Sequence, residues 1–589
     1  MHKKILYLFF FIGFVGFGQQ QLAEEYFKEG EYQKAIELYK KLYSRNKFSN
    51  TYLQRLIKSY QELEQYAKAE KIITNHLNDY PGQFQYWIDL GYNFQLQNDE
   101  KQAEKYYKKT IKLLENNPFS GFAIGQSFQS KHLLDYALLA YKKGLETNQN
   151  PNFYIKIAGI YGELGDFDNM FDTYLDLIEY QSRHLSTVQQ YIGKFITSDP
   201  ENNYNLILKK RILIRSQNNP DVLWNKMLSW LYTEQQEYNK AFIQEKAIHK
   251  RTPYNSLSRI FELGKITFEN KEYSNSKTIF EFVTNTSKIE NEVIDSKLYI
   301  ILSDKALGVD NETTNKSFEQ LIKDHGSKAN TIDVQLAYAH FLAFDFKESQ
   351  KAITLLKHLL NTDIKKLEIG KVKLELGDIY LLNNQFGNAL INYTQVQTDI
   401  KNHPIAQEAR FRVAKTSYYK GDFEWAETQL EVLKKSTSQL IANDALHLSL
   451  IISDNSLTDS IKTPLELYAK ADLETFQNKK EQAIQTLDSL ISQFPEHKII
   501  DEALFKQAEI FESLKQYNLA INNYIQLIEI NTDDILVDDA YYRLGEISLK
   551  IGDPEAAKNY YQKIIFDYPS SIHLVAARKK FRELRGDKI

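Results

Sequence analysis

The residue types that carry out catalysis or bind metals are scattered in this sequence rather than grouped. The 12 histidines include no H-E-x-x-H pattern and no pair four residues apart, so the common helical zinc motif is missing. The stretch NTDDILVDDAYY holds four aspartates, Asp533, Asp534, Asp538 and Asp539. Their spacing differs from that of a calcium loop, and they precede a predicted helix whose free amides they can cap. We therefore expect no catalytic residue, no metal site and no cofactor.

Composition limits the partners that the chain could attract. With 73 basic and 77 acidic side chains, the formal net charge is −4, so no global field recruits nucleic acid or an anionic membrane. The absence of cysteine excludes disulfides, thiolate zinc sites and the acylated cysteine of a bacterial lipoprotein. Only 23 glycines and 11 prolines occur in 589 residues, while 13% of the residues are aromatic, which indicates a folded and mainly helical chain.

The N-terminus, MHKKILYLFFFIGFVGFGQQ, has the pattern of a secretory signal peptide. Lys3 and Lys4 precede the apolar run Ile5–Phe17, and cleavage is expected after Gly18. This run is shorter than the about 20 residues that span a bilayer, which disfavours the alternative of an uncleaved membrane anchor. We expect a soluble mature chain that is exported to the periplasm and has no lipid anchor.

A sequence repeat predicts the secondary-structure elements of the chain. The small residues Ala35, Ala69, Ala103 and Ala137 follow one another at intervals of 34, and Met170 follows after 33. Each unit predicts a helix, a short turn and a second helix. In the third unit the first helix places Trp87, Leu90, Gly91 and Phe94 on one face. Ala103 and Tyr107 lie on the facing side of the second helix. We expect Gly91 and Ala103 to be small because the two helices approach closely there, and Trp87 and Tyr107 to fill the wider spaces.

The same structural positions recur along the chain with a changing period. The further residues that we assign to them are Tyr39, Gly125, Tyr141, Gly377, Ala389, Tyr393, Ala426, Ala483, Ala520, Gly545 and Ala557. A degenerate unit is expected around NYNLILKKRILI. The interval is 37 from Ala483 to Ala520 and from Ala520 to Ala557, but 57 from Ala426 to Ala483, which leaves room for an inserted helix over Gln439–Ile452 and a polar loop over Ser453–Thr463.

These residues resemble the tetratricopeptide repeat (TPR), whose order of aromatic, Leu-Gly, aromatic, Ala, aromatic and Ala they follow. The resemblance implies an all-α fold, a right-handed α-solenoid of roughly thirteen to fifteen tandem TPR helix hairpins. The turn at Tyr568–Ser571, within the text from Ile405 to Asp587, is also similar to TPR proteins of Gram-negative envelopes.

The repeat pattern predicts seven segments along the chain. They are a signal peptide (1–18), an N-terminal TPR array (19–182), degenerate TPR-like helical repeats (183–365), a TPR pair (366–436), the inserted helix and loop (437–463), a C-terminal TPR array (464–570) and a capping helix with its tail (571–589). The basic run ARKKFRELRGDK fits the capping helix, because cations favour the negative end of a helix. A patch for anionic lipid or nucleic acid is the alternative for this run.

The TPR resemblance implies a binding groove lined by the first helices of successive repeats. In the N-terminal array the implied groove residues are Lys58, Gln61, Ile88, Tyr92, Gln95, Phe122, Gln126 and Gln129. Amides and aromatic rings of this kind suit an extended peptide. The known TPR clamp for a C-terminal carboxylate is not expected, because Phe119 and Ala123 occupy its third-helix basic positions. In the C-terminal array the corresponding residues are acidic, Glu502, Glu509, Glu512, Asp539 and Glu546, and they suit a cationic partner, so the two halves could bind different partners.

The predicted function is a non-catalytic protein-protein interaction scaffold of the cell envelope that binds protein or peptide partners in the concave groove. No nucleic acid is expected, and the mature chain should not insert into a membrane, although a partner could hold it at one. A dedicated accessory or adaptor subunit of an outer-membrane assembly, secretion or motility complex is the first alternative. An envelope enzyme is the second, and a deep polar pocket with convergent titratable groups would support it.

Overall fold

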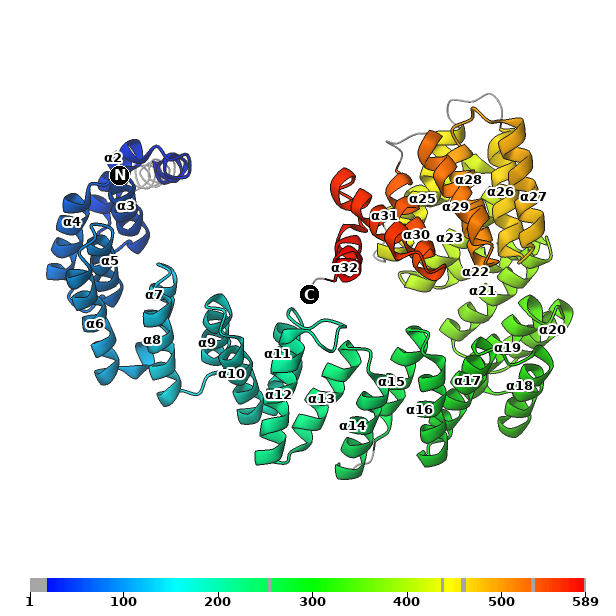
Figure 1. Cartoon of the computed structure of the whole chain (residues 1–589), viewed down its shortest axis with the longest axis horizontal. Coiled ribbons are helices and arrows are strands. Elements are labelled where there is room, and N and C mark those ends of the chain that lie inside the picture. Colours follow the sequence, from blue (N-terminus) through cyan, green and yellow to red (C-terminus); the bar gives the residue numbers. More distant parts are fainter. Residues whose placement is uncertain (1–18, 253–255, 436–438, 457–461, 531–534, 587–589) are drawn as a thin grey trace, which may run out of the picture. The chain divides into compact units, whose positions relative to one another are not determined.

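The computed structural model describes residues 19–252, 256–435, 439–456, 462–530 and 535–586, and every regular element among them is a helix (Figure 1). The predicted signal peptide, Asp533, Asp534 and the loop residues 457–461 lie outside the described residues. None of the described helices is both long and apolar enough to cross a membrane. The chain divides into two compact units, Met1–Arg251 and Thr252–Ile589.

In the first unit, a helix over residues 19–28 begins a series of antiparallel helix pairs. Its other helices are α2 (Tyr32–Arg45), α3 (Asn50–Glu62), α4 (Tyr66–Asp79), α5 (Phe84–Gln95), α6 (Glu100–Asn116), α7 (Gly121–Gln129), α8 (Leu134–Thr147), α9 (Pro151–Glu163), α10 (Phe167–Tyr180), α11 (Leu185–Ile192), α12 (Asn203–Asn218), α13 (Val222–Glu234) and α14 (Tyr238–Arg251). At the expected degenerate unit, the short α11 and the helix α12, which covers NYNLILKKRILI, both pack against α10.

The second unit continues the pattern with two helices outside the pairs. Its helices are α15 (Ser258–Glu269), α16 (Tyr273–Thr286), α17 (Glu290–Ala306), α18 (Asn311–His325), α19 (Ile332–Phe344), α20 (Ser349–Leu360), α21 (Lys366–Leu382), α22 (Phe386–Asp399), α23 (Pro404–Tyr419), α24 (Phe423–Leu433), α25 (Gln439–Ser456), α26 (Thr463–Phe476), α27 (Lys480–Gln493), α28 (Ile500–Ser513), α29 (Tyr517–Ile530), α30 (Val537–Lys550), α31 (Pro554–Asp567) and α32 (Leu574–Arg585). Helix α25 lies at the predicted insertion, and α32 ends the series.

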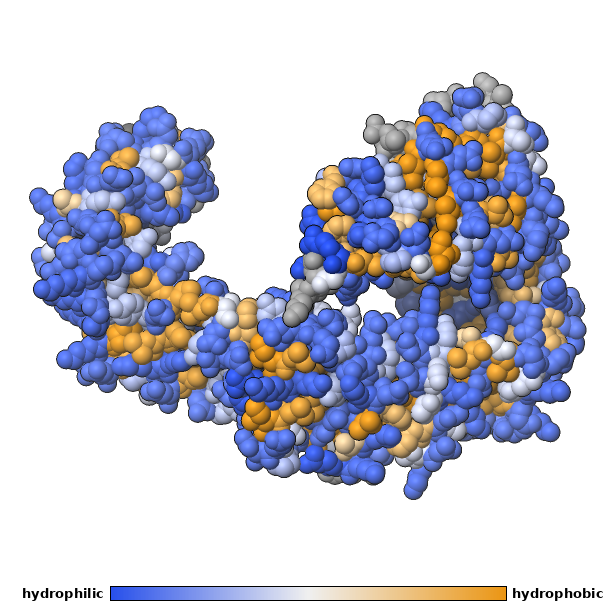
Figure 2. Space-filling view, in the orientation of Figure 1, coloured by the Kyte–Doolittle hydropathy of each residue, from blue (hydrophilic) through white to orange (hydrophobic). Residues whose placement is uncertain are grey.

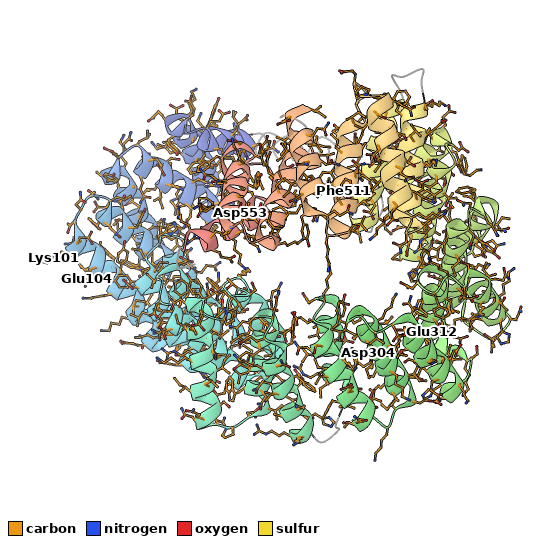
Figure 3. All side chains as sticks on the ribbon, turned by 45° about the vertical axis from the view of Figure 1, so that its right-hand side comes forward. Lys101, Glu104, Asp304, Glu312, Phe511 and Asp553 are labelled. Carbon is orange, nitrogen blue, oxygen red and sulfur yellow. The ribbon has the colours of Figure 1, made fainter. Side chains whose placement is uncertain are left out.

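The turn between the two helices of a hairpin contains one residue with a left-handed backbone. These residues are Gly30, Glu64, Asn98, His132, Gly165, Gln236, Lys271, Gly308, Lys347, Asn384, Gly421, Asn478, Lys515 and Gly552. The left-handed residue reverses the chain, and the second helix then begins at a cap such as Asp553, whose carboxylate accepts a hydrogen bond from the amide of Ala556 at 3.0 Å (Figure 3). Fourteen regular hairpins result, and they confirm the predicted all-α solenoid fold.

Pairing within a hairpin depends on an aromatic ring that lies over a glycine. Gly91, Gly125, Gly264, Gly377 and Gly545 each face a Tyr or Phe of the second helix sixteen positions later. A Cβ atom at Gly91 would lie 2.5 Å from Cε1 of Tyr107, closer than such atoms can approach. Glycine is therefore required at position 91 to admit this ring, whereas the sequence pattern assigned the ring to the wider spaces beside the contact.

Side chains of successive hairpins form the cores of the units. The small marker residues predicted from the repeat, such as Ala103 and Ala389, are fully buried. One apolar cluster of the second unit extends from Ile294 to Ile547, so its core continues across the inserted α25. Polar pairs link neighbouring helices as well; Lys277 of α16 donates to Asp304 of α17 at 2.6 Å (Figure 3). The boundary at Arg251 falls inside the predicted degenerate segment, where the sequence marks no break.

Candidate functional site

The first helix of each hairpin, called helix A below, carries the residues that the sequence assigned to a binding groove. In the first unit only Lys58 of α3 and Gln126 of α7 are exposed among them. Tyr92 is half-buried beneath the ammonium group of Lys131, which lies 5.0 Å from its ring centroid. Phe122 is half-buried because its ring packs edge-on against Phe153 at a centroid distance of 5.5 Å.

Two of the predicted groove residues belong to the interior instead. Ile88 is 1% exposed and joins an apolar core cluster, so it cannot contact a ligand in this structure. Gln61 is 7% exposed, and its amide donates to the buried Asn93 of the next helix A at 3.4 Å. The TPR resemblance placed both side chains in the groove, but the next hairpin covers them.

The side chains of Gln95 and Gln129 form hydrogen bonds inside their hairpins. In several hairpins a tyrosine of the second helix reaches through the hairpin, and its hydroxyl donates to a polar residue on helix A. The pairs of this kind are Tyr39 with Glu24 (2.8 Å), Tyr107 with Gln95 (2.7 Å), Tyr141 with Gln129 (3.1 Å), Tyr393 with Asp378 (2.6 Å), Tyr524 with Glu512 (2.8 Å) and Tyr561 with Glu546 (2.6 Å). These bonds hold the helix A side chains in a fixed orientation.

Most acidic residues of the predicted groove in the C-terminal array lie close to a basic side chain at the next helix A. Glu509 lies 3.5 Å from Arg543, Glu512 lies 3.5 Å from Lys550, and Glu546 lies 3.8 Å from Lys580. Asp539 lies 2.6 Å from Nε2 of His573, a residue 34 positions later. Glu502 lies on α28 beside a separate cavity. These basic side chains neutralise the carboxylates beside them. The surface therefore does not carry the uniform negative charge that the sequence suggested.

Asp472 and Asp378 form two further ion pairs between helices of this kind, and neither was predicted from the sequence. Asp472 of α26 lies 3.2 Å from Lys506 and 3.9 Å from Lys415. Burial acts to raise the pKa of the Asp472 carboxyl, but Lys415 and Lys506 hold it below its usual value. The signal was present in the sequence as an acid and a base 34 residues apart on successive A helices.

Asp378 of α21 is another largely buried member of the series. Its carboxylate accepts a hydrogen bond from Tyr393 at 2.6 Å and pairs with Arg412 of α23, which also lies 2.6 Å from Glu408. Burial raises the pKa of Asp378 to about 6, although Arg412 and Tyr393 act in the opposite direction. The two helices are thereby joined by a largely desolvated ion pair.

These groups line a cavity of about 470 Å³ between α21, α23, α25 and α26, called the insertion pocket below. Its apolar lining consists of Leu381, Phe411, Leu440, Ile441 and Phe476, and its charged lining consists of Asp378, Glu408, Arg412, Lys415 and Asp444. The lining contains no histidine, serine or cysteine, so it offers no nucleophile activated by a histidine. Within the described ranges, no three His, Cys, Asp or Glu side chains are grouped so that they could hold a metal ion. The pocket is suited to binding.

A second cavity, of about 720 Å³, lies between α25, the turn before α28 and the start of α30. Apolar side chains gather over this part of the second unit (Figure 2), including Leu450, Ile530 and Ile535, which are 41%, 52% and 75% exposed.

Comparison with protein families identifies tetratricopeptide repeats in four segments. One tetratricopeptide repeat model matches residues 467–497 and 539–571, and a second matches residues 19–48 and 501–534. The matched segments coincide with helix pairs of both units, including α26 with α27 and α30 with α31. No curated protein sequence matches the chain.

Several solved structures align with this chain at low identity and low TM-score. A structure titled Naa15/Naa10 bound to HypK-THB aligns with 12% identity and a TM-score of 0.32, over 96% of this chain and 85% of that one. The hetero-tetramer Cut9-Hcn1 of APC/C aligns with 13% identity and a TM-score of 0.25, over 96% of both chains. Yeast Tom70 aligns with 13% identity and a TM-score of 0.26, over 80% of this chain and 96% of that one. Likeness at this level carries no information on function.

Proposed function

We propose that this tetratricopeptide repeat protein is a non-catalytic scaffold that binds protein partners on the faces of its A helices. The repeat itself supports this function, because stacked hairpins expose a long series of equivalent helix faces on which a partner can make many contacts.

The observation that carries the proposal is that the polar residues of these faces are held in place before any partner arrives. Glu512 is fixed by Tyr524 at 2.8 Å, and Asp472 is fixed by Lys506 at 3.2 Å. A surface whose side chains are already ordered loses less conformational entropy on binding, which favours affinity. Exposed side chains such as Lys58 of α3 and Gln126 of α7 also lie on A helices and are available for contact.

The cellular setting of the scaffold is part of the proposal. Lys3, Lys4 and the apolar run Ile5–Phe17 support export, with cleavage after Gly18 and a periplasmic mature chain. We place the scaffold in the cell envelope on this basis. A permanent adaptor subunit of an envelope complex is the second candidate, because the long helical-repeat core of the second unit could serve one fixed partner as well as several transient ones.

Site-specific photocrosslinking in source cells tests the scaffold. The crosslinking residue p-benzoylphenylalanine would replace the exposed Gln126 on α7, a helix A, and the exposed Lys142 on α8, its paired second helix, as the matched control. We expect discrete protein adducts at position 126 and none at position 142. Equal adducts at both positions, or none at either, would contradict binding on the A helices. Co-elution of one partner at a fixed ratio would support the adaptor.

A further inference from the structure

The insertion pocket differs from the other helix A faces because its outer wall is not part of a repeat. Helix α25 lies between two hairpins and is anchored by the buried Ala445 and Leu448, and Ser449 donates to Glu427 of α24 at 2.5 Å. This anchoring leaves the first turn of α25 facing α23, where Leu440 and Ile441 line the pocket. Leu440 is 73% exposed, an unusual position for a leucine at the rim of an apolar cavity.

The opposite wall is rigid. The end of α26 reaches the turn between α21 and α22, because the amide of Gln477 donates to Oδ1 of Asn384 at 2.9 Å and to the carbonyl oxygen of Leu381 at 3.3 Å. The Phe476 ring packs edge-on against Phe344 at 5.7 Å between centroids. Residues more than ninety positions apart in sequence therefore fix this wall, and the pocket exists without a ligand.

Charge at the pocket favours a cation beside the apolar group. Arg412 is neutralised by Asp378 and Glu408, which lies at the exposed end of that network. Asp444 on α25 is exposed and borders the same cavity. The ammonium group of Lys415 is directed to Asp472 at 3.9 Å. Asp444 therefore adds a negative charge at the rim beside Glu408, which Arg412 already contacts, whereas the basic groups of the pocket already have acidic partners.

We infer that the insertion pocket binds a partner peptide through one large apolar side chain that is followed by a lysine or arginine. The apolar side chain would fill the space between Phe411, Leu440 and Phe476, and its basic neighbour would pair with Glu408 and Asp444. A volume of about 470 Å³ lies in the range of cavities that take small ligands and accommodates a single aromatic anchor. The inference rests on the proposed scaffold function and names the chemistry of one of its partners.

Synthetic peptides test this specificity on the full chain. The probes are end-blocked serine-glycine octapeptides with a central Phe-Arg, Phe-Glu or Ala-Arg pair, and saturation-transfer NMR measures their affinity. We expect the Phe-Arg peptide to bind roughly threefold to tenfold more tightly than the other two, the range of one exposed ion pair or one partly buried ring. Equal affinity of the three peptides, or no binding of any, would overturn the inference.

Matched variants of α25 locate the site. Leu440→Asp should weaken the Phe-Arg peptide to the level of the Ala-Arg peptide, while Leu446→Asp, at a residue of the same helix that is 46% exposed and does not line the pocket, should not. Asp444→Lys should abolish the preference for Arg over Glu, while Asn443→Lys should retain it. An unchanged preference in the Asp444 variant would refute the assigned role of the rim.

Crosslinking separates this inference from the scaffold function. A Phe-Arg probe with benzoylphenylalanine in place of phenylalanine should label Phe411, Leu440 or their neighbours, as read by mass spectrometry. If adducts form at position 126 in cells but the probe does not label the pocket, the scaffold function is supported and the peptide site is contradicted. Labelling of the pocket without adducts in cells would remove the general binding role of the A helices.

Discussion

At the scale of the residue, the contact between a glycine and an aromatic ring determines how five of the described hairpins close, such as Gly91 with Tyr107. The ring lies where a Cβ atom would be, and its hydroxyl reaches the far side of helix A. This explains why amide and acidic side chains that looked like ligand contacts, such as Gln95 and Glu546, act as hydrogen-bond acceptors inside the hairpin. These tyrosines both pack the hairpin and orient the polar side chains of helix A.

The glycine contact can be tested in one hairpin with an internal control. Gly377→Ala should reduce the free energy of unfolding of its region by about 1 to 3 kcal/mol, because the new methyl group overlaps the Tyr393 ring. Gly387→Ala, on the second helix of the same hairpin with nothing within 4 Å of its Cβ position, should instead stabilise the helix by about 0.5 to 1 kcal/mol. Urea unfolding followed by circular dichroism measures both, and effects of the same sign would contradict the assigned packing.

At the scale of the element, the turn between paired helices stores a small strain wherever its left-handed residue is not glycine. Lys515 has a φ of 59° and Gly552 a φ of 81° at the same position of consecutive hairpins. Lys515→Gly should stabilise by about 0.5 to 1 kcal/mol, since glycine adopts this conformation without penalty. Gly552→Lys should destabilise by a similar amount. Thermal unfolding of the two variants provides the comparison, and a destabilised Lys515→Gly variant would refute the turn assignment.

The link between α10 and α12 replaces the regular hairpin contacts at the degenerate repeat. Arg215 lies 2.6 Å from Asp176 and 2.8 Å from Glu179, with its side chain only 17% exposed. Arg215→Met should cost about 1 to 2 kcal/mol, because it leaves the clustered carboxylates of Asp172, Asp176 and Glu179 without their shared cation. Urea unfolding should show this loss, and adding Asp176→Asn should restore part of it. Lys240→Met, at an exposed ion pair, should change stability by less than about 0.5 kcal/mol.

The Asp472 link predicts how acid affects the second unit. Lys415 and Lys506 lower the pKa of Asp472 below its usual value, so the carboxylate stabilises the fold above the ordinary aspartate pKa of about 4 and this contribution is lost as pH falls through the lowered pKa. Local hydrogen exchange of α26 and α28 should therefore increase on acidification below pH 4 in the wild type. Asp472→Asn should exchange faster near neutral pH and respond less to acid. An identical acid response in both proteins would contradict this link.

At the scale of the whole molecule, contacts between neighbouring hairpins dominate each unit, so damage should remain local. Hydrogen exchange of the Gly377→Ala variant should increase in the helices around it, from α19 to α23, and remain unchanged in α3 to α8 of the first unit. The two units are separate compact bodies, which supports this expectation. A uniform increase along the chain would show instead that the units unfold together.

The sequence by itself determined the repeat, the helix pairs and the position of the insertion, because these depend on contacts between residues close together in the chain. Small residues at intervals of 34 and 37, such as Ala103 and Ala520, identify where two neighbouring helices must pack. The spacing of the small residues also predicted a degenerate unit around NYNLILKKRILI, which lies in α12. Export and the cellular setting remain predictions from the first residues.

Only the tertiary structure decided which polar residues remain free to bind. Ile88 is covered by the next hairpin, Glu509 is matched by Arg543, and Phe476 meets Phe344 across the second unit. The insertion pocket exists because α25 fills the gap between two hairpins and lies against α23, a contact that no local spacing encodes. Burial and charge pairing depend on what lies opposite a side chain, and in a stacked array that neighbour comes from another repeat.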